Sequence, residues 1–149
     1  GRAGVAQVQI RGRRLQAVRH LLKALATELG ELLLGEVAHV PDDRRRQVLG
    51  FLMETMEQPV ALADLAEALS LSASRTGHLV RELFDTTFPA LVTSVKLREG
   101  ARLLSSTDHP IGEVAAMVGY KDQNYFSRLF RLAFGLSPRT YRRRYPAEV

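Results

Sequence analysis

The 149-residue sequence contains no cysteine. This absence excludes disulfide bonds, thiolate zinc sites and cysteine nucleophiles, and it is typical of a cytosolic protein. No apolar run approaches the roughly 20 residues needed to cross a bilayer, so we expect no membrane-spanning segment. The hydrophobic content of 46% and the charged content of 25% are those of a soluble globular protein.

The residue patterns of known catalytic and metal sites are missing as well. The four histidines show no metal-ligand spacing such as HExxH; they are His20, His39, His78 and His109. The sequence has no GxSxG elbow, no Walker loop and no GxGxxG turn. We therefore predict a protein that is not an enzyme and that holds neither a metal ion nor a cofactor.

A helix-turn-helix pattern is present near the C-terminal end. Four apolar residues recur at the spacing of one helix face, and they are Ile111, Val114, Ala115 and Val118. Gly119 follows, where a chain that leaves a helix often needs a left-handed residue. Asp122 is then placed to cap the N-terminus of a second helix.

The second helix of this pattern has an apolar face and a polar face. Its predicted inward residues are Tyr125, Phe126, Leu129 and Phe130. Its predicted outward residues are Gln123, Asn124, Ser127, Arg128 and Arg131. Amide and guanidinium groups pair with base edges in the major groove, so we interpret this helix as a DNA reader. The alternative is a helical protein-interaction module without DNA-sequence specificity.

A further helix start follows, with Gly135 ending one helix, Ser137 as the next N-cap and Pro138 at the first helical position. The whole run resembles the signature of the AraC/XylS family of bacterial transcription regulators. The matching residues are Ile111, Glu113, Val114, Ala115, Val118, Gly119, Tyr120, Asp122, Tyr125, Phe126, Ser127, Arg128, Phe130, Arg131, Gly135, Ser137, Pro138, Tyr141 and Arg142. The resemblance implies double-stranded DNA as the partner and a cytoplasmic, nucleoid-associated location, and it raises RNA polymerase as a further partner.

The same resemblance implies a first helix-turn-helix motif, at about residues 60–84. The residues assigned to DNA on its second helix are Ser74, Arg75, Gly77, His78 and Arg81. Three residues depart from the family pattern, because Thr76 stands where Leu is usual, Val80 where Phe is usual, and Asp85 where Gly commonly ends the helix. Gly77 also offers no side chain for base readout. We therefore expect this motif to be the weaker reader.

The positive charge of the sequence is concentrated near its C-terminus. The net charge is +5, and residues 100–149 carry 8 Lys/Arg against 4 Asp/Glu, whereas residues 59–99 carry 4 against 5. A basic run is often only a solvated surface, but this one adjoins the predicted reader helix. We therefore assign phosphate contacts to Arg139, Arg142 and Arg143.

A helix at about residues 88–105 would join the two motifs. Phe88-Pro89 suits its start, because proline is favoured at the first helical position. At 1.5 Å per residue, about 18 residues give a rod of roughly 27 Å. Successive major grooves on one DNA face lie about 34 Å apart, so two readers on this rod, with their own width added, fit adjacent grooves.

The N-terminal part predicts a long helix from Arg13 to about Leu34. Its apolar residues alternate at spacings of three and four; they are Leu15, Val18, Leu22, Leu25, Leu29 and Leu32. Three interpretations stay open: a homodimerisation helix over residues 13–35, a helix packed on an upstream sensor domain, or a helix folded back on this domain. Gly30 weakens the interpretation as a homodimerisation helix, because glycine is unfavourable inside a helix. The N-terminal glycine suggests a tag scar or an excised fragment, so we expect an effector, if there is one, to bind an upstream domain absent from this chain.

These patterns together predict an all-α, homeodomain-like fold in which a long linker helix joins two helix-turn-helix motifs, preceded by a long N-terminal helix. Residues 1–40 would form the helical linker. Residues 41–149 would form the DNA-binding domain, opened by a helix that begins at Pro41 and carries Met53 among its apolar residues, with the second motif at about residues 110–134. The predicted function is transcription regulation through sequence-specific recognition of double-stranded DNA in two adjacent major grooves.

Overall fold

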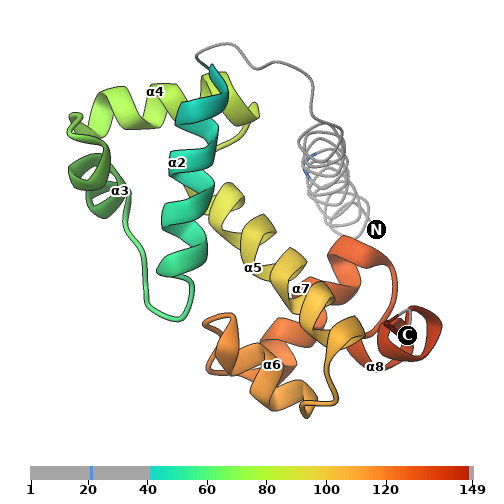
Figure 1. Cartoon of the computed structure of the whole chain (residues 1–149). Coiled ribbons are helices and arrows are strands. Elements are labelled where there is room, and N and C mark those ends of the chain that lie inside the picture. The colour runs from blue at the N-terminus through green and yellow to red at the C-terminus, as the bar shows by residue number, and fades with distance from the viewer. Residues whose placement is uncertain (1–20, 22–40, 148–149) are drawn as a thin grey trace, which may run out of the picture.

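The structure, a computed structural model, describes Leu21 and residues 41–147. The described residues form only α-helices, with no strand: α2 (Pro41–Glu54), α3 (Leu62–Leu69), α4 (Ala73–Phe84), α5 (Phe88–Ser106), α6 (Ile111–Met117), α7 (Gln123–Phe134) and α8 (Pro138–Arg144) (Figure 1). The all-α prediction is confirmed for this part of the chain. The helix predicted over residues 13–34 lies outside the described residues except for Leu21, which is partly buried against the hydrophobic core.

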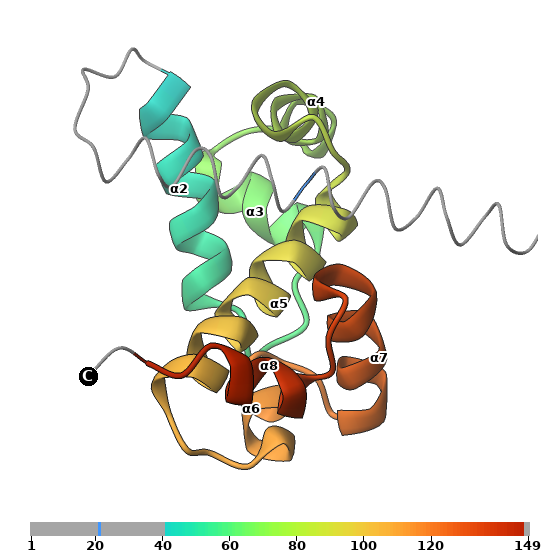
Figure 2. The ribbon, with the colours of Figure 1, turned by 90° about the vertical axis from the view of Figure 1, so that its right-hand side faces the viewer.

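Helix α5 is the centre of the fold. It contacts α2, α4, α6, α7 and α8, and it runs between the α3–α4 pair and the α6–α7 pair (Figures 1 and 2). Leu91, Leu97 and Leu104 are almost fully buried along its length. Gly100 lets α7 approach closely, because a Cβ atom there would lie 3.0 Å from the ring of Phe126. Since α5 shares the core with both pairs, it sets their relative orientation.

The turn between α3 and α4 is built from a left-handed serine and a capping serine. Ser70 has φ 54°, and the next amide, that of Leu71, donates to the carbonyl of Ala66 at 2.9 Å. Ser72 Oγ then accepts a hydrogen bond from the amide of Arg75 at 3.2 Å. These bonds satisfy backbone groups that each helix end would otherwise leave without partners. Ser72 is therefore the N-cap of α4.

The turn between α6 and α7 follows the predicted pattern. Gly119 has φ +84°, and the amide of Tyr120 donates to the carbonyl of Ala115 at 2.8 Å. Asp122 Oδ1 accepts hydrogen bonds from the amides of Asn124 at 2.8 Å and Tyr125 at 3.3 Å. A carboxylate at this end also interacts favourably with the helix dipole. The predicted roles of Gly119 and Asp122 are both confirmed.

A row of aromatic rings connects the second pair to α8. The ring centres of Phe126, Phe130, Phe134, Tyr141 and Tyr145 follow one another at 5.7, 4.4, 5.3 and 4.9 Å. Ser137 caps α8 by accepting from the amide of Thr140 at 3.2 Å, as predicted. The row makes α7 and α8 parts of one packed unit.

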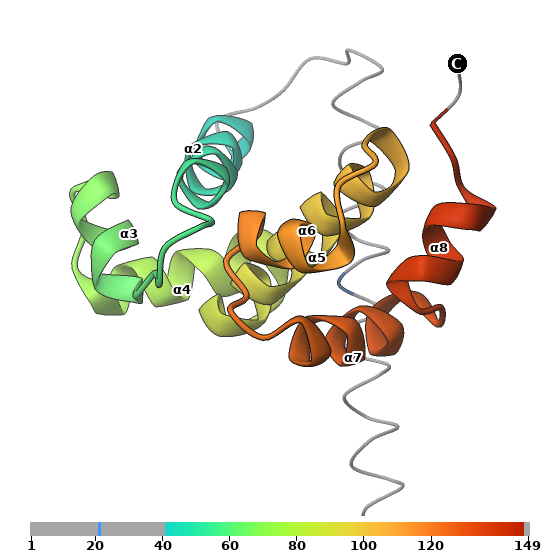
Figure 3. The same ribbon diagram turned by 90° about the horizontal axis from the view of Figure 1, so that it is seen from below.

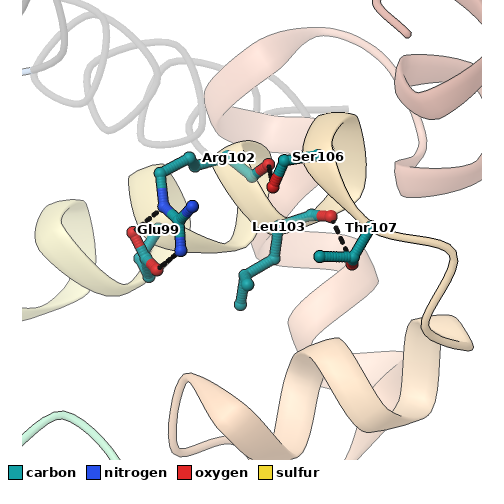
Figure 4. Close-up of polar contacts among 5 residues, drawn as sticks. All are labelled: Glu99, Arg102, Leu103, Ser106 and Thr107. Atoms are coloured by element: carbon teal, nitrogen blue, oxygen red, sulfur yellow. Dashed lines mark hydrogen bonds and ion pairs between the residues drawn. The ribbon is translucent and has the colours of Figure 1, made fainter. Parts of the chain in front are cut away.

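At the C-terminal end of α5, side chains form hydrogen bonds with backbone carbonyl groups and with one another (Figure 4). Ser106 Oγ donates to the carbonyl of Arg102 and Thr107 Oγ1 to that of Leu103, each at 2.7 Å. Glu99 accepts two hydrogen bonds from the Arg102 guanidinium, at 2.8 and 2.5 Å. The helix therefore ends one residue later than predicted, at Ser106. It begins at Phe88, so Pro89 occupies the second helical position and not the first.

Helix α2 packs on α3 and α5. Val48, Leu52 and Met56 are buried, as their spacing indicates, but Met53 is 49% exposed and lies outside the apolar face. Met56 follows the helix in the turn that leads to α3.

We expect Gly50→Ala to stabilise the domain. Gly50 is an exposed residue inside α2, and a Cβ atom there would meet nothing within 4 Å. Alanine has the higher helix propensity and restricts the unfolded chain, so the free energy of unfolding should rise by about 0.5–1 kcal/mol. Urea denaturation followed by circular dichroism would measure the change. An unchanged or lower midpoint would contradict this prediction.

Candidate nucleic-acid interface

Helices α4 and α7, the second helices of the two pairs, lie along one side of the molecule. Seen from below, both run on the side opposite α2, with α5 between them (Figure 3). The view from the right-hand side agrees, because α2 again lies opposite α4 and α7 (Figure 2). The fold therefore brings the two predicted reader helices to a common surface.

The surface of α7 carries most of the predicted polar residues. Gln123, Asn124, Arg128 and Arg131 are exposed, and Ser127 is half-buried. Gln123 rests against α6, because a Cβ atom on Gly112 would lie 2.8 Å from its Oε1 atom. Amide and guanidinium donors therefore stand along α7 on the outside of the pair.

Tyr125 does not face inward, so this prediction was wrong. It is 48% exposed, whereas Phe126 and Phe130 are fully buried. The buried stripe of α7 runs through Phe126, Phe130 and Ala133, and Tyr125 lies beside that stripe rather than within it. Its ring contacts Tyr120 at 5.9 Å between ring centres, and the guanidinium carbon of Arg128 lies 5.8 Å from its ring centre. The spacing i, i+3 between Tyr125 and Arg128 was the sequence signal for this contact.

The surface of α4 carries a second set of polar residues. Ser74, Arg75, His78 and Arg81 are exposed. Gly77 differs from its predicted outward position, because it is half-buried and a Cβ atom there would lie 3.6 Å from Leu62 Cδ2 of α3. Gly77 therefore lies on the side of α4 that meets α3. Its lack of a side chain does not reduce the number of polar groups on the outer surface of α4.

The first pair accommodates the three residues that depart from the family pattern, two of them in its core and the third, Asp85, at the exposed end of α4. Thr76 is completely buried, and its hydroxyl donates to the carbonyl of Ser72 at 2.9 Å, so its polar atom keeps a partner. Val80 is also completely buried. Asp85 takes the left-handed conformation expected of glycine, with φ 50°, and its amide donates to the carbonyl of Arg81 at 2.9 Å. The first pair keeps its helix-turn-helix form despite these changes.

The three arginines assigned to phosphate differ in their surroundings. Arg139 and Arg143 are exposed on α8. Arg142 is half-buried, and it donates from Nε to the carbonyl of Leu104 at 3.1 Å and from Nη2 to that of His109 at 2.5 Å. The guanidinium of Arg142 therefore ties α8 to the end of α5 and to the loop before α6, and these hydrogen bonds compete with the predicted phosphate contact.

We expect Arg142→Ala and Arg143→Ala to differ in the salt dependence of DNA binding. Loss of Arg143 should lower the slope of log affinity against log salt by about 1, as a lost phosphate contact does, and leave stability unchanged. Loss of Arg142 should leave that slope unchanged and lower the free energy of unfolding by about 1–3 kcal/mol, because two carbonyls lose a charged donor. Titrations at several salt concentrations, with urea denaturation of each variant, test this. Equal slopes for the two variants would contradict it.

In the described part of the chain, no group of three or more His, Asp or Glu residues could hold a metal ion. No described helix is long and apolar enough to cross a membrane.

A helix-turn-helix family model matches residues 65–144, which run from within α3 to the end of α8. The chain belongs to the AraC family. Its described domain is therefore an AraC-type DNA-binding domain.

AraC-family relatives resemble the chain in sequence and in fold. The transcriptional activator NphR of a Rhodococcus species is 36% identical over 124 residues, which are 80% of this chain and 36% of NphR. The C-terminal domain of AraT, a response regulator from Geobacillus stearothermophilus, is 33% identical with a TM-score of 0.61, covering 69% of this chain and 86% of that domain.

A third comparison concerns the fold alone. The DNA-binding domain of AdpA, solved in complex with a target DNA, is 23% identical with a TM-score of 0.60, and the match covers 66% of this chain and 88% of that one. The chain spans less than half the length of the first curated relatives that it matches, at 42%, 36% and 48%.

Proposed function

We propose that this domain binds double-stranded DNA sequence-specifically, with α4 and α7 in two adjacent major grooves. The observation that carries the proposal is the position of both helices on one side of the rod formed by α5. The 19 residues of α5 give a length of about 28 Å. With the width of the readers added, this length suits the separation of about 34 Å between successive grooves on one DNA face. The AdpA domain, solved with DNA, shares the fold and supports this arrangement.

Each reader would contribute a different share of base recognition. On α7, Gln123 and Arg128 have side chains that make bidentate contacts with base edges, and Asn124, Ser127 and Arg131 surround them. On α4, the residues available are Ser74, Arg75, His78 and Arg81. Both helices carry two arginines, but α7 adds the amides of Gln123 and Asn124, which offer more bidentate pairing than the serine and histidine of α4, so α7 would be the stronger reader. Arg139 and Arg143 on α8 would contact phosphates.

Selection from a random duplex pool at fixed salt concentration tests the proposal. We expect two enriched blocks of sequence, centred about one helical turn apart, with the more strongly conserved block contacted by α7. Affinity for the selected duplex should also fall steeply as salt rises. A pool without enrichment, together with binding that salt does not weaken, would instead favour a protein-interaction module.

The whole protein to which this domain belongs would be a transcription regulator acting in the cytoplasm at the nucleoid. NphR is named as an activator, which supports RNA polymerase as a partner of this protein too. Because the chain spans less than half the length of such relatives, an effector would bind a part of the protein beyond this chain.

Residues 13–35 would form a dimerisation helix. This proposal is based on the spacing from Leu15 to Leu32, and the segment lies outside the described residues apart from Leu21. We expect micromolar self-association of the chain, because the segment is short and contains Gly30. Sedimentation should show that a Leu22→Asp, Leu25→Asp double variant is monomeric where the wild type pairs. A wild type that stays monomeric at high micromolar concentration would contradict the proposal.

A further inference from the structure

An exposed aromatic ring stands beside the arginine to which we assign base reading. Tyr125 is 48% exposed, and the Arg128 guanidinium carbon lies 5.8 Å from its ring centre. A guanidinium at this distance from an aromatic ring is attracted to it, enough to shift an equilibrium about two- to fivefold where water has access. The ring of Tyr125 can therefore hold the guanidinium of Arg128 through a cation–π interaction.

Tyr125 is itself supported by a second aromatic residue. Tyr120, in the turn before α7, meets it edge to face, with 5.9 Å between ring centres and 62° between ring planes. Tyr120 also contacts the fully buried Phe126, at 5.7 Å, and Lys96 Nζ of α5 lies 5.5 Å from its ring centre. Burial raises the pKa of the Tyr120 hydroxyl to about 12, which agrees with a ring packed between Tyr125 and the core. The orientation of Tyr125 is thus tied to the packed core.

We propose that Tyr125 is a positioning residue for Arg128, whose ring orders the guanidinium before DNA arrives and so sharpens the choice of base. The inference rests on the proposed function. A free arginine side chain samples many rotamers and loses that freedom when it binds. A guanidinium that is already held on a ring loses less rotamer freedom when it binds. Fewer of its orientations can then pair with a wrong base.

The competing explanation is that Tyr125 touches DNA itself, through its hydroxyl or its ring. The two explanations differ in two measurable ways. A positioning ring does not need the hydroxyl, so Tyr125→Phe should behave like the wild type. A positioning ring also acts only through Arg128, so its removal should have no further effect once Arg128 is absent.

The experiment uses the 149-residue chain and the duplex selected by the wild type. Arg128→Ala first identifies the base pair whose preference depends on Arg128. Preference at that pair is then measured by competition among the four duplexes that differ there, for Tyr125→Phe, Tyr125→Leu, Tyr125→Gln and the double variant Tyr125→Leu, Arg128→Ala. We expect full preference with Phe and a two- to fivefold loss with Leu or Gln at that pair alone. The double variant should match Arg128→Ala.

Several results would overturn the inference. A loss with Phe equal to that with Leu would assign a direct contact to the hydroxyl. Additive losses in the double variant would show a contact independent of Arg128, and unchanged preference with both Leu and Gln would show that the ring has no role. A wild type without any base preference would refute the proposed function as well. Gln suits an exposed helical position, so it keeps the test valid if Leu disturbs folding.

Discussion

Gly119→Ala should destabilise the domain by about 2–5 kcal/mol and weaken DNA binding with it. Gly119 has φ +84°, a conformation that alanine adopts only with strain. A Cβ atom there would also lie 2.2 Å from the carbonyl oxygen of Met56. That oxygen belongs to the backbone of the turn after α2, so it cannot move aside as a side chain can. To admit the methyl group, the turn of the second pair must shift away from α2.

The matched control for this variant is Gly135→Ala. Gly135 has a similar φ of +76°, but a Cβ atom there would meet nothing within 4 Å. The control therefore carries the conformational strain without the collision, and we expect it to lose about 1–2 kcal/mol. Urea denaturation of the two variants measures the difference. If both variants lose the same amount of stability, the Met56 carbonyl does not limit which side chain fits at residue 119.

Arg128→Ala should remove base preference at one or two positions of the selected site, by about 1–3 kcal/mol. The reason is that Arg128 is exposed on α7 and its guanidinium can donate two parallel hydrogen bonds to guanine. Its loss should leave preference in the block read by α4 unchanged. Selection with the variant, compared with selection by the wild type, measures the preference at every position.

Arg143→Ala is the control for the lost charge. Arg143 is exposed on α8 rather than on a reader helix. We expect this variant to bind all sequences more weakly by the same factor and to select the same site as the wild type. If the two variants select the same site, Arg128 does not read bases.

The turns and caps of this fold could be predicted from the sequence because their causes are local. Gly119, Asp122 and Ser137 act on backbone groups within a few residues of themselves, and all three have their predicted roles. The family pattern added the first pair, where the local signals were weaker. There Ser70 and Asp85 are left-handed without being glycine, which no spacing rule indicates.

The features that could not be predicted depend on contacts between distant segments. Arg142 follows a basic pattern typical of phosphate binding, but the carbonyl of Leu104, 38 positions away, lies beside it in the fold. The collision site of Gly119 is likewise set by Met56. Tyr125 was misplaced for another reason, since periodicity locates an apolar stripe but not its edge, and a tyrosine next to Phe126 suits either side.

Hydroxyl-radical footprinting of the wild-type chain on its selected duplex tests most directly whether α4 and α7 read adjacent grooves. We expect protection of backbone segments flanking two successive major grooves on one face of the duplex, about one helical turn apart. Cleavage between them on the opposite face should be unaffected. Protection around a single groove, or protection of grooves on opposite faces, would contradict a domain in which α5 places two readers on one side.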